Sequence, residues 1–175
     1  AYLACITFAD AMFGRILDAL AASPYADNTV VIFISDNGYH VGEKDRFTKM
    51  SLWERSTRVP FMLAGPGIPR DRRSTLPVGL IDIYPTLMSL CDLPAPAGLE
   101  GTSLVPHLRD PQALTGRTVL TSFGRGNDSL RDERYRYTRY ADGGAELYDH
   151  LTDPDEWFNL AGRPETAALE AAFAR

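Results

Sequence analysis

The chain has 175 residues, of which 45% are hydrophobic and 23% charged, a composition typical of about one folded domain and not of a disordered segment. Its 18 Lys and Arg against 23 Asp and Glu give a formal net charge of −5, which argues against a nucleic-acid partner or a polybasic membrane-binding surface. The longest uninterrupted apolar runs, residues 1–6 and 30–34, are far shorter than the roughly 20 residues that cross a bilayer. We therefore expect no nucleic-acid partner and no membrane partner.

The first half of the chain has the pattern of an α/β protein. Apolar residues recur with a 3.6-residue period over residues 2–22, which predicts an amphipathic helix. Two short apolar runs, Thr29–Ser35 and Pro60–Ala64, are typical of strands buried on both faces. The polar connection between them, residues 36–58, is unusually long, and such loops between core strands are usually functional.

The second half changes in character. A helix is predicted over Ile83–Cys91, with Asp82 as its N-cap. Further along, short segments alternate with Gly, Asn and Asp turns, which predicts a small antiparallel sheet closed by a helix from Pro164 onward. The predicted strands are Thr118–Phe123, Tyr135–Tyr140 and Glu146–Asp149. We predict an α/β fold for residues 1–110 and a small α+β subdomain for residues 111–175.

Candidate metal ligands follow the first predicted strand. Asp36 and Asn37 come directly after Ser35, and open α/β sheets place their sites beyond the carboxyl ends of strands. A carboxylate and an amide oxygen are hard ligands that suit Ca²⁺ or Mg²⁺. An Asp-Asn-Gly turn without a metal explains the same residues, because all three are common turn formers. Ca²⁺ takes about 6–8 oxygens, so further ligands must come from elsewhere.

Four cationic or titratable side chains lie in the same loop: His40, Lys44, Arg46 and Lys49. A metal beside such groups can hold a doubly charged oxyanion, because the metal binds one edge and Lys or Arg neutralises the leaving oxygen. Taken singly, each of the four is more simply explained as a solvated loop residue. No nucleophile motif is recognisable in the chain.

The remaining reactive residue types point to structural roles. Cys5 and Cys91 fall at apolar helix positions and are expected to be buried. His107 and His150 have no chemical context and are expected at the surface. The alternation of Arg and Tyr over Arg134–Tyr140 predicts a strand with one aromatic and one charged face, in preference to a nucleic-acid-binding segment.

The stretch Thr29–Gly67, TVVIFISDNGYHVGEKDRFTKMSLWERSTRVPFMLAGPG, resembles the C-terminal half of the catalytic domain of a type I sulfatase. Tyr2–Leu20 and Leu80–Leu90 resemble the flanking helices, and Arg136–Leu160 resembles the closing subdomain of the iduronate-2-sulfatase-like branch. The resemblance implies part of an alkaline-phosphatase-like mixed sheet flanked by helices. It also implies hydrolysis of a sulfated small molecule or glycan by a formylglycine nucleophile.

Within this resemblance, Asp36 and Asn37 match two ligands of a Ca²⁺ site, which in some members holds Mg²⁺. Lys49 matches the lysine that contacts the sulfate and stabilises the leaving oxygen, and His40 is placed near the substrate. The Cys/Ser-x-Pro-x-Arg motif that yields formylglycine does not occur in the 175 residues. We therefore expect the nucleophile upstream of this chain, and no ester hydrolysis by this piece alone.

Two other functions fit the sequence. One is a phosphonate or phosphodiester hydrolase of the same superfamily, because sulfate and phosphate esters share tetrahedral oxyanion geometry. The other is a non-catalytic module that binds anionic glycans. Only the missing nucleophile and its neighbours would separate the phosphonate or phosphodiester hydrolase from the sulfatase. The predicted strand at 29–35 tests the module, because pairing on both sides within one compact chain would favour it. An unpaired edge on that strand favours a piece of a larger sheet and makes self-association possible.

Overall fold

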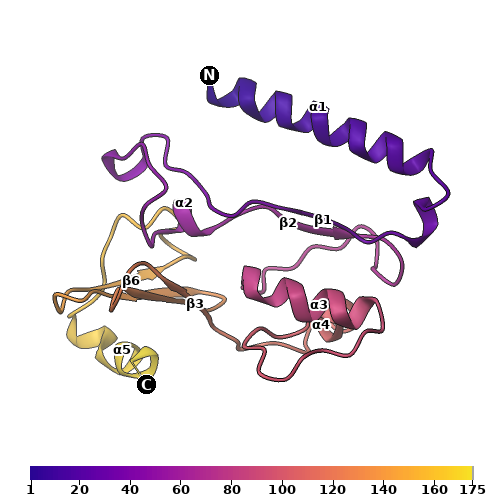
Figure 1. Ribbon diagram of the computed structural model, residues 1–175. Helices are drawn as coiled ribbons and strands as arrows, with labels where there is room; N and C mark the ends of the chain where they lie inside the picture. Colours follow the sequence, from indigo (N-terminus) through magenta and orange to yellow (C-terminus); the bar gives the residue numbers. More distant parts are fainter. Residues whose placement is uncertain (175) are drawn as a thin grey trace. The chain divides into compact units, whose positions relative to one another are not determined.

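The computed structural model describes residues 1–174 (Figure 1). The chain forms two compact units: residues 1–33 with 62–70, and residues 34–61 with the chain from 71 onward. The boundary near residue 110 that the composition suggests stays a prediction. None of the helices in the described residues combines the length and the hydropathy that a bilayer crossing requires.

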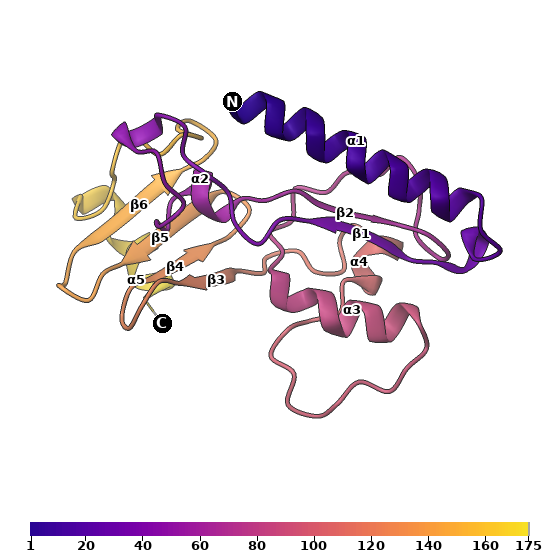
Figure 2. The same ribbon diagram turned by 45° about the horizontal axis from the view of Figure 1, so that its top comes forward.

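In the first unit, one long helix lies beside two short strands. Helix α1 (Tyr2–Ala21) confirms the helix predicted from the 3.6-residue period. Strands β1 (Val31–Ile34) and β2 (Phe61–Ala64) pair with each other in a two-stranded sheet, and α1 runs alongside them (Figures 1 and 2). Phe13 of α1 packs on Phe33 of β1 with ring centroids 4.6 Å apart. Within the described residues β1 has no second neighbour, so one of its edges is open.

The two cysteines are both exposed, so the prediction that they are buried is wrong. Cys5 lies on α1, which buries none of its residues. Cys91 lies just beyond helix α3 (Ile83–Leu90), at its C-cap. Apolar periodicity predicted both helices correctly. It could not predict burial, because burial depends on what covers the apolar face.

Asp82 holds together the helical part of the second unit. It closes the 3₁₀ turn Leu80–Asp82 before α3 and is fully buried. Its carboxylate accepts hydrogen bonds from the backbone N–H groups of Gly79 and Thr102, each at 2.8 Å, and from the Arg117 guanidinium at 2.8 Å. The expected N-cap bond to α3 is absent among the described residues. Asp82 instead ties the turn before α3 to the segment leading into helix α4 (Val105–Arg109).

An antiparallel sheet forms the rest of the second unit, with the strands in sequence order (Figure 2). Three of the strands were predicted; the fourth, β4, has the polar sequence Asp-Ser-Leu-Arg and gives little strand signal. The strands are β3 (Val119–Ser122), β4 (Asp128–Arg131), β5 (Tyr135–Arg139) and β6 (Ala145–Asp149). The 3₁₀ turn Pro164–Thr166 and helix α5 (Ala167–Phe173) follow, as expected from Pro164 onward.

The two faces of this sheet are chemically different. Leu130, Tyr137 and Leu147 are neighbours across β4, β5 and β6, and Tyr137 stacks on Phe173 of α5 with centroids 5.9 Å apart. The opposite face is polar yet buried, because Arg136 and its neighbours are covered by the 36–58 segment. The predicted strand is confirmed, but its faces are mixed: Arg136 is buried on one face with Thr138, and the exposed Arg139 shares the other face with Tyr135 and Tyr137.

We expect Asp82→Asn to destabilise the second unit by about 3–5 kcal/mol, the usual cost of breaking a buried pair. All three partners of Asp82 are donors, so the Asn NH₂ group would face another donor. Urea unfolding followed by tryptophan fluorescence measures the change. Glu100→Gln removes an exposed carboxylate and serves as the control. Equal stability of the two variants would contradict the role assigned to Asp82.

Candidate functional site

The loop that follows β1 is fixed at its start by a close backbone contact. The Gly38 N–H donates at 2.8 Å to the carbonyl of Ser56, which lies within helix α2 (Glu54–Thr57). A Cβ at Gly38 would lie 2.1 Å from the Arg55 carbonyl oxygen, so only glycine allows this approach. The Ser35 hydroxyl donates to the Asn37 carbonyl at 2.8 Å. The Asp-Asn-Gly segment is therefore held by its backbone, which leaves its side chains available.

Asp36 and Asn37 carry side-chain oxygens without an intramolecular partner. Asp36 is exposed and Asn37 half-buried. Across residues 1–174, no hydrogen bond or ion pair engages either side chain. An Asp-Asn-Gly turn that served only to cap a strand would normally bond these side chains to its own backbone. Here a carboxylate and an amide oxygen stand free at the end of a strand, as a pair of hard ligands requires.

The loop folds back on itself, so that its second arm, which contains Arg46 and Thr48, runs beside its first arm, which contains His40 and Gly42. The His40 N–H donates to the Thr48 carbonyl at 2.9 Å, and the Gly42 N–H donates to the Arg46 carbonyl at 2.9 Å. Lys49 follows Thr48 directly, so it lies next to the arm that begins with Asp36 and Asn37. Its side chain is exposed and makes no ion pair within the described residues.

His40 has a structural role in this loop. It is fully buried; Nδ1 lies 3.2 Å from the Glu43 carbonyl oxygen and Nε2 lies 3.0 Å from the Ser51 hydroxyl. A carbonyl oxygen can only accept, so Nδ1 carries a proton and donates to Glu43, while the Ser51 hydroxyl beside Nε2 donates to the Ser56 hydroxyl at 2.8 Å. Both ring nitrogens are thus engaged in joining the two arms. Contact between His40 and a substrate stays a prediction.

The Lys44 ammonium is surrounded by aromatic rings. It lies 4.6 Å from the centroid of Trp53 and 4.7 Å from that of Tyr148, with Trp157 at 5.9 Å. It also donates to the Tyr148 hydroxyl and to the Glu156 carbonyl. Burial lowers the pKa of Lys44 even though carboxylates nearby oppose the shift. Lys44 is therefore not a solvated loop residue, because its aromatic surroundings bind the ammonium within the protein.

Beneath the loop lies a buried ionic cluster that sequence reasoning missed. Arg136 donates to Glu156 at 2.7 Å, to Glu54 at 2.5 Å and to the Thr57 hydroxyl at 2.9 Å. The Glu156 carboxylate also accepts from the Glu54 N–H at 2.8 Å. These bonds join β5 to α2, so they hold the segment that follows the candidate site against the sheet.

His150 completes the cluster, so the expectation of a surface histidine is wrong there. Its Nε2 lies 2.9 Å from Glu156, and its Nδ1 lies 3.1 Å from the Arg131 guanidinium. Guanidinium only donates, so Nδ1 accepts and the Nε2–H donates to Glu156. Burial raises the pKa of Glu156, but the His150 hydrogen bond and the Arg136 charge outweigh it and leave the pKa lowered. His107 is also half-buried, with Nε2 2.6 Å from the Ser74 hydroxyl.

Glu54, His150 and Glu156 place one ligand atom each within 4.8 Å of one another, a spacing that could hold a metal ion. Arginines already occupy this position. Arg136 bonds both carboxylates, and Arg131 approaches Glu54 to 3.6 Å. A divalent cation would have to displace two guanidinium groups from the charges that they neutralise. We therefore assign the group to an ion-pair network, and Asp36 and Asn37 remain the candidate metal ligands.

The sulfatase family model matches residues 1–93. The chain belongs to the sulfatase family. It is 44% identical over 161 residues to a sulfatase of Formosa agariphila, covering 92% of this chain and 32% of that protein. It is 34% identical to arylsulfatase K of Bos taurus, covering 97% of this chain and 34% of that protein. The sulfatase chain thus spans about a third of the length of the curated relatives it matches.

Solved structures agree with this assignment. A 2-O GAG sulfatase superposes with a TM-score of 0.80 at 32% identity, over 91% of this chain and 37% of that one. The phosphonate monoester hydrolase of Agrobacterium radiobacter superposes with a TM-score of 0.77 at 28% identity, over 94% of this chain and 37% of that one. The predicted α/β fold of the alkaline-phosphatase-like class is confirmed.

We expect Arg136→Leu to destabilise the second unit by about 3–5 kcal/mol, because Glu54 and Glu156 would keep buried charges without their main partner. Arg139→Leu is the matched control: it lies on the same strand, three residues on, with an exposed side chain on the opposite face. Urea unfolding measures both variants. Similar losses for the two would show that the cluster contributes little.

The lowered pKa of Glu156 predicts a loss of stability in acid. Its folded pKa lies below the ordinary value of 4.5, so its contribution is present above about pH 4.5 and is lost as the pH falls through the folded pKa. The free energy of unfolding should fall by up to about 1.4 kcal/mol per pH unit for this one proton. Glu156→Gln should flatten that part of the profile. An unchanged slope would contradict the assignment.

Proposed function

We propose that this chain is the C-terminal part of a sulfuric ester hydrolase that acts on a sulfated glycan or small molecule. The proposal rests on one loop of this sulfatase-family chain. Within the described residues, the side chains of Asp36, Asn37 and Lys49 make no hydrogen bond or ion pair. The neighbouring side chains of His40 and Lys44, in contrast, are both hydrogen-bonded within the protein. Residues 1–110 are proposed to belong to the catalytic domain and residues 111–175 to a closing subdomain.

Asp36 and Asn37 fit a divalent cation, Ca²⁺ or Mg²⁺, because both offer hard oxygens. Two ligands are fewer than either ion requires, so the remaining ligands are proposed to come from the part of the relatives' length that this chain does not span. When bound, the cation supplies positive charge that polarises a sulfate ester. The open edge of β1 supports the same proposal, because a buried-type strand with one neighbour fits a larger sheet.

Lys49 is proposed to hold the sulfate and to neutralise the charge that develops on the leaving oxygen. An exposed ammonium on a loop anchored at both arms can meet a tetrahedral oxyanion without first breaking an ion pair. Formylglycine is proposed as the nucleophile, upstream of Ala1. His40 then serves the site by joining the two arms of the loop, and we propose that it lies close to the bound substrate.

A phosphonate monoester hydrolase is the second candidate, supported by the structural likeness to the Agrobacterium radiobacter enzyme. Both reactions place negative charge on the oxygens of a tetrahedral centre, and a metal with a lysine stabilises either. Relative rates on an aryl sulfate and an aryl phosphonate separate the two.

We expect Lys49→Ala to lower kcat on an aryl sulfate about 100- to 1000-fold, the usual effect of removing one oxyanion-stabilising group. Asp36→Asn and Asn37→Ala should lower activity and should also weaken Ca²⁺ binding, measured by calorimetry. The assay uses the polypeptide that contains this chain together with the upstream segment of its relatives. Asp45→Asn, an exposed change in the same loop, is the control. Full activity of Lys49→Ala would refute the assignment.

A further inference from the structure

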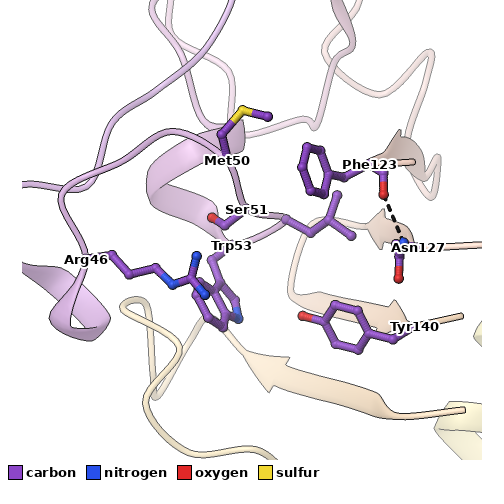
Figure 3. A pocket seen from close by; sticks show the side chains of 8 residues that line it. Arg46, Met50, Ser51, Trp53, Phe123, Asn127 and Tyr140 are labelled. Carbon is purple, nitrogen blue, oxygen red and sulfur yellow. Dashed lines mark hydrogen bonds between the residues drawn. The ribbon is translucent and has the colours of Figure 1, made fainter. Parts of the chain in front are cut away.

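The second unit contains a pocket of about 320 Å³ next to the candidate site, a size at the lower end of ligand pockets. Figure 3 shows Arg46 entering it from the loop and Phe123, Asn127 and Tyr140 facing it from the sheet. Met50, which follows Lys49 directly in the chain, also lines it. One wall of the pocket is therefore formed by the residue next in the chain to Lys49, the lysine proposed to bind the sulfate.

The walls of this pocket are mainly apolar, and three of the residues that line it are aromatic. The Trp53 N–H donates to Glu146 at 2.7 Å, and the Tyr140 hydroxyl donates to the same carboxylate at 3.1 Å. The Asn127 amide donates to the Phe123 carbonyl at 3.0 Å. Because these polar ends are already paired, the surfaces left for a ligand are the flat face of Tyr140 and the ring of Phe123, which is 44% exposed. Such surfaces suit the apolar faces of a ring.

Arg46 supplies the charge. Its guanidinium carbon lies 5.0 Å from the centroid of the Trp53 ring, a cation–π contact. In the part of the chain that the structure describes, no carboxylate accepts a hydrogen bond from its N–H groups. A guanidinium without a carboxylate partner can bind a carboxylate or a sulfate in a bidentate manner.

We infer that this pocket binds an anionic sugar ring of the substrate, adjacent to the sulfate that is cleaved. The ring packs on Tyr140 and Phe123, and its carboxylate or second sulfate accepts hydrogen bonds from Arg46. This inference rests on the proposed function and names the substrate class for the same site. It assigns to Arg46 and Phe123 the selection of a charged glycan over a simple aryl ester.

The test compares Arg46→Ala and Phe123→Ala with the parent polypeptide that contains the upstream segment. The substrates are a sulfated disaccharide with a uronate carboxylate, a disaccharide with a second sulfate in its place, and an aryl sulfate without a sugar. We expect KM for at least one disaccharide to rise about tenfold in Arg46→Ala and severalfold in Phe123→Ala, relative to KM for the aryl sulfate. The disaccharide that shows the rise identifies the anion. Arg46→Lys should recover part of the loss, because it keeps the charge but not the fork.

Arg109→Ala, an exposed arginine outside the pocket, is the control and should leave every KM unchanged. Hydrolysis by the parent with unchanged KM ratios in both variants would overturn the inference and leave the proposed function intact. A parent that cleaves none of the three substrates would refute the proposed function. Calorimetric binding of the disaccharides then decides the inference by itself: weaker binding to Arg46→Ala supports it, and equal binding overturns it.

Discussion

The buried pairing of Arg136 with Glu54 and Glu156 is the interaction on which the second unit depends. One guanidinium, 2% exposed, reaches both carboxylates and so joins a strand of the sheet to the helix that anchors the candidate site. Glu156 adopts a left-handed backbone conformation, with φ of 61°, which is costly for a residue other than glycine. The ion pairs compensate for that cost. Because each charge is matched and hydrogen-bonded, the polar face of the sheet can be buried at all.

This arrangement explains how an exposed loop can hold a fixed geometry. The arms of the loop are joined by His40, and its start lies against α2 through the close approach at Gly38. Lys44 attaches its tip to the sheet side through the aromatic rings around the ammonium. The buried groups of the loop therefore fix its position, and the side chains of Asp36, Asn37 and Lys49 stay available to bind a ligand.

Sequence reasoning succeeded where the pattern was local. The period of α1, the β-branched run of β1 and the alternation of β5 are set by neighbouring residues, and all three elements form where predicted. Strand β1, however, is half-buried with Ile34 exposed, and not buried on both faces as predicted. It failed where the answer depends on distant partners. Nothing near Glu156 or His150 in the sequence shows that both meet Arg136 or Arg131 in a buried cluster. The best available sign was the Arg-Tyr alternation of β5, which predicted a charged face without showing that this face is inside.

The candidate site illustrates the same limit. Asp36 and Asn37 could be proposed from their place after a strand, because the carboxyl end of a strand is a general location for sites. Lys44 and Lys49 could not be told apart by that argument, since both are cations of one loop. The structure separates them completely. They are the only two lysines in the 175 residues, one enclosed by aromatic rings and the other exposed. An amine-reactive reagent applied to the folded chain would therefore modify Lys49 and spare Lys44, so chemical acylation offers a footprint of whatever covers Lys49.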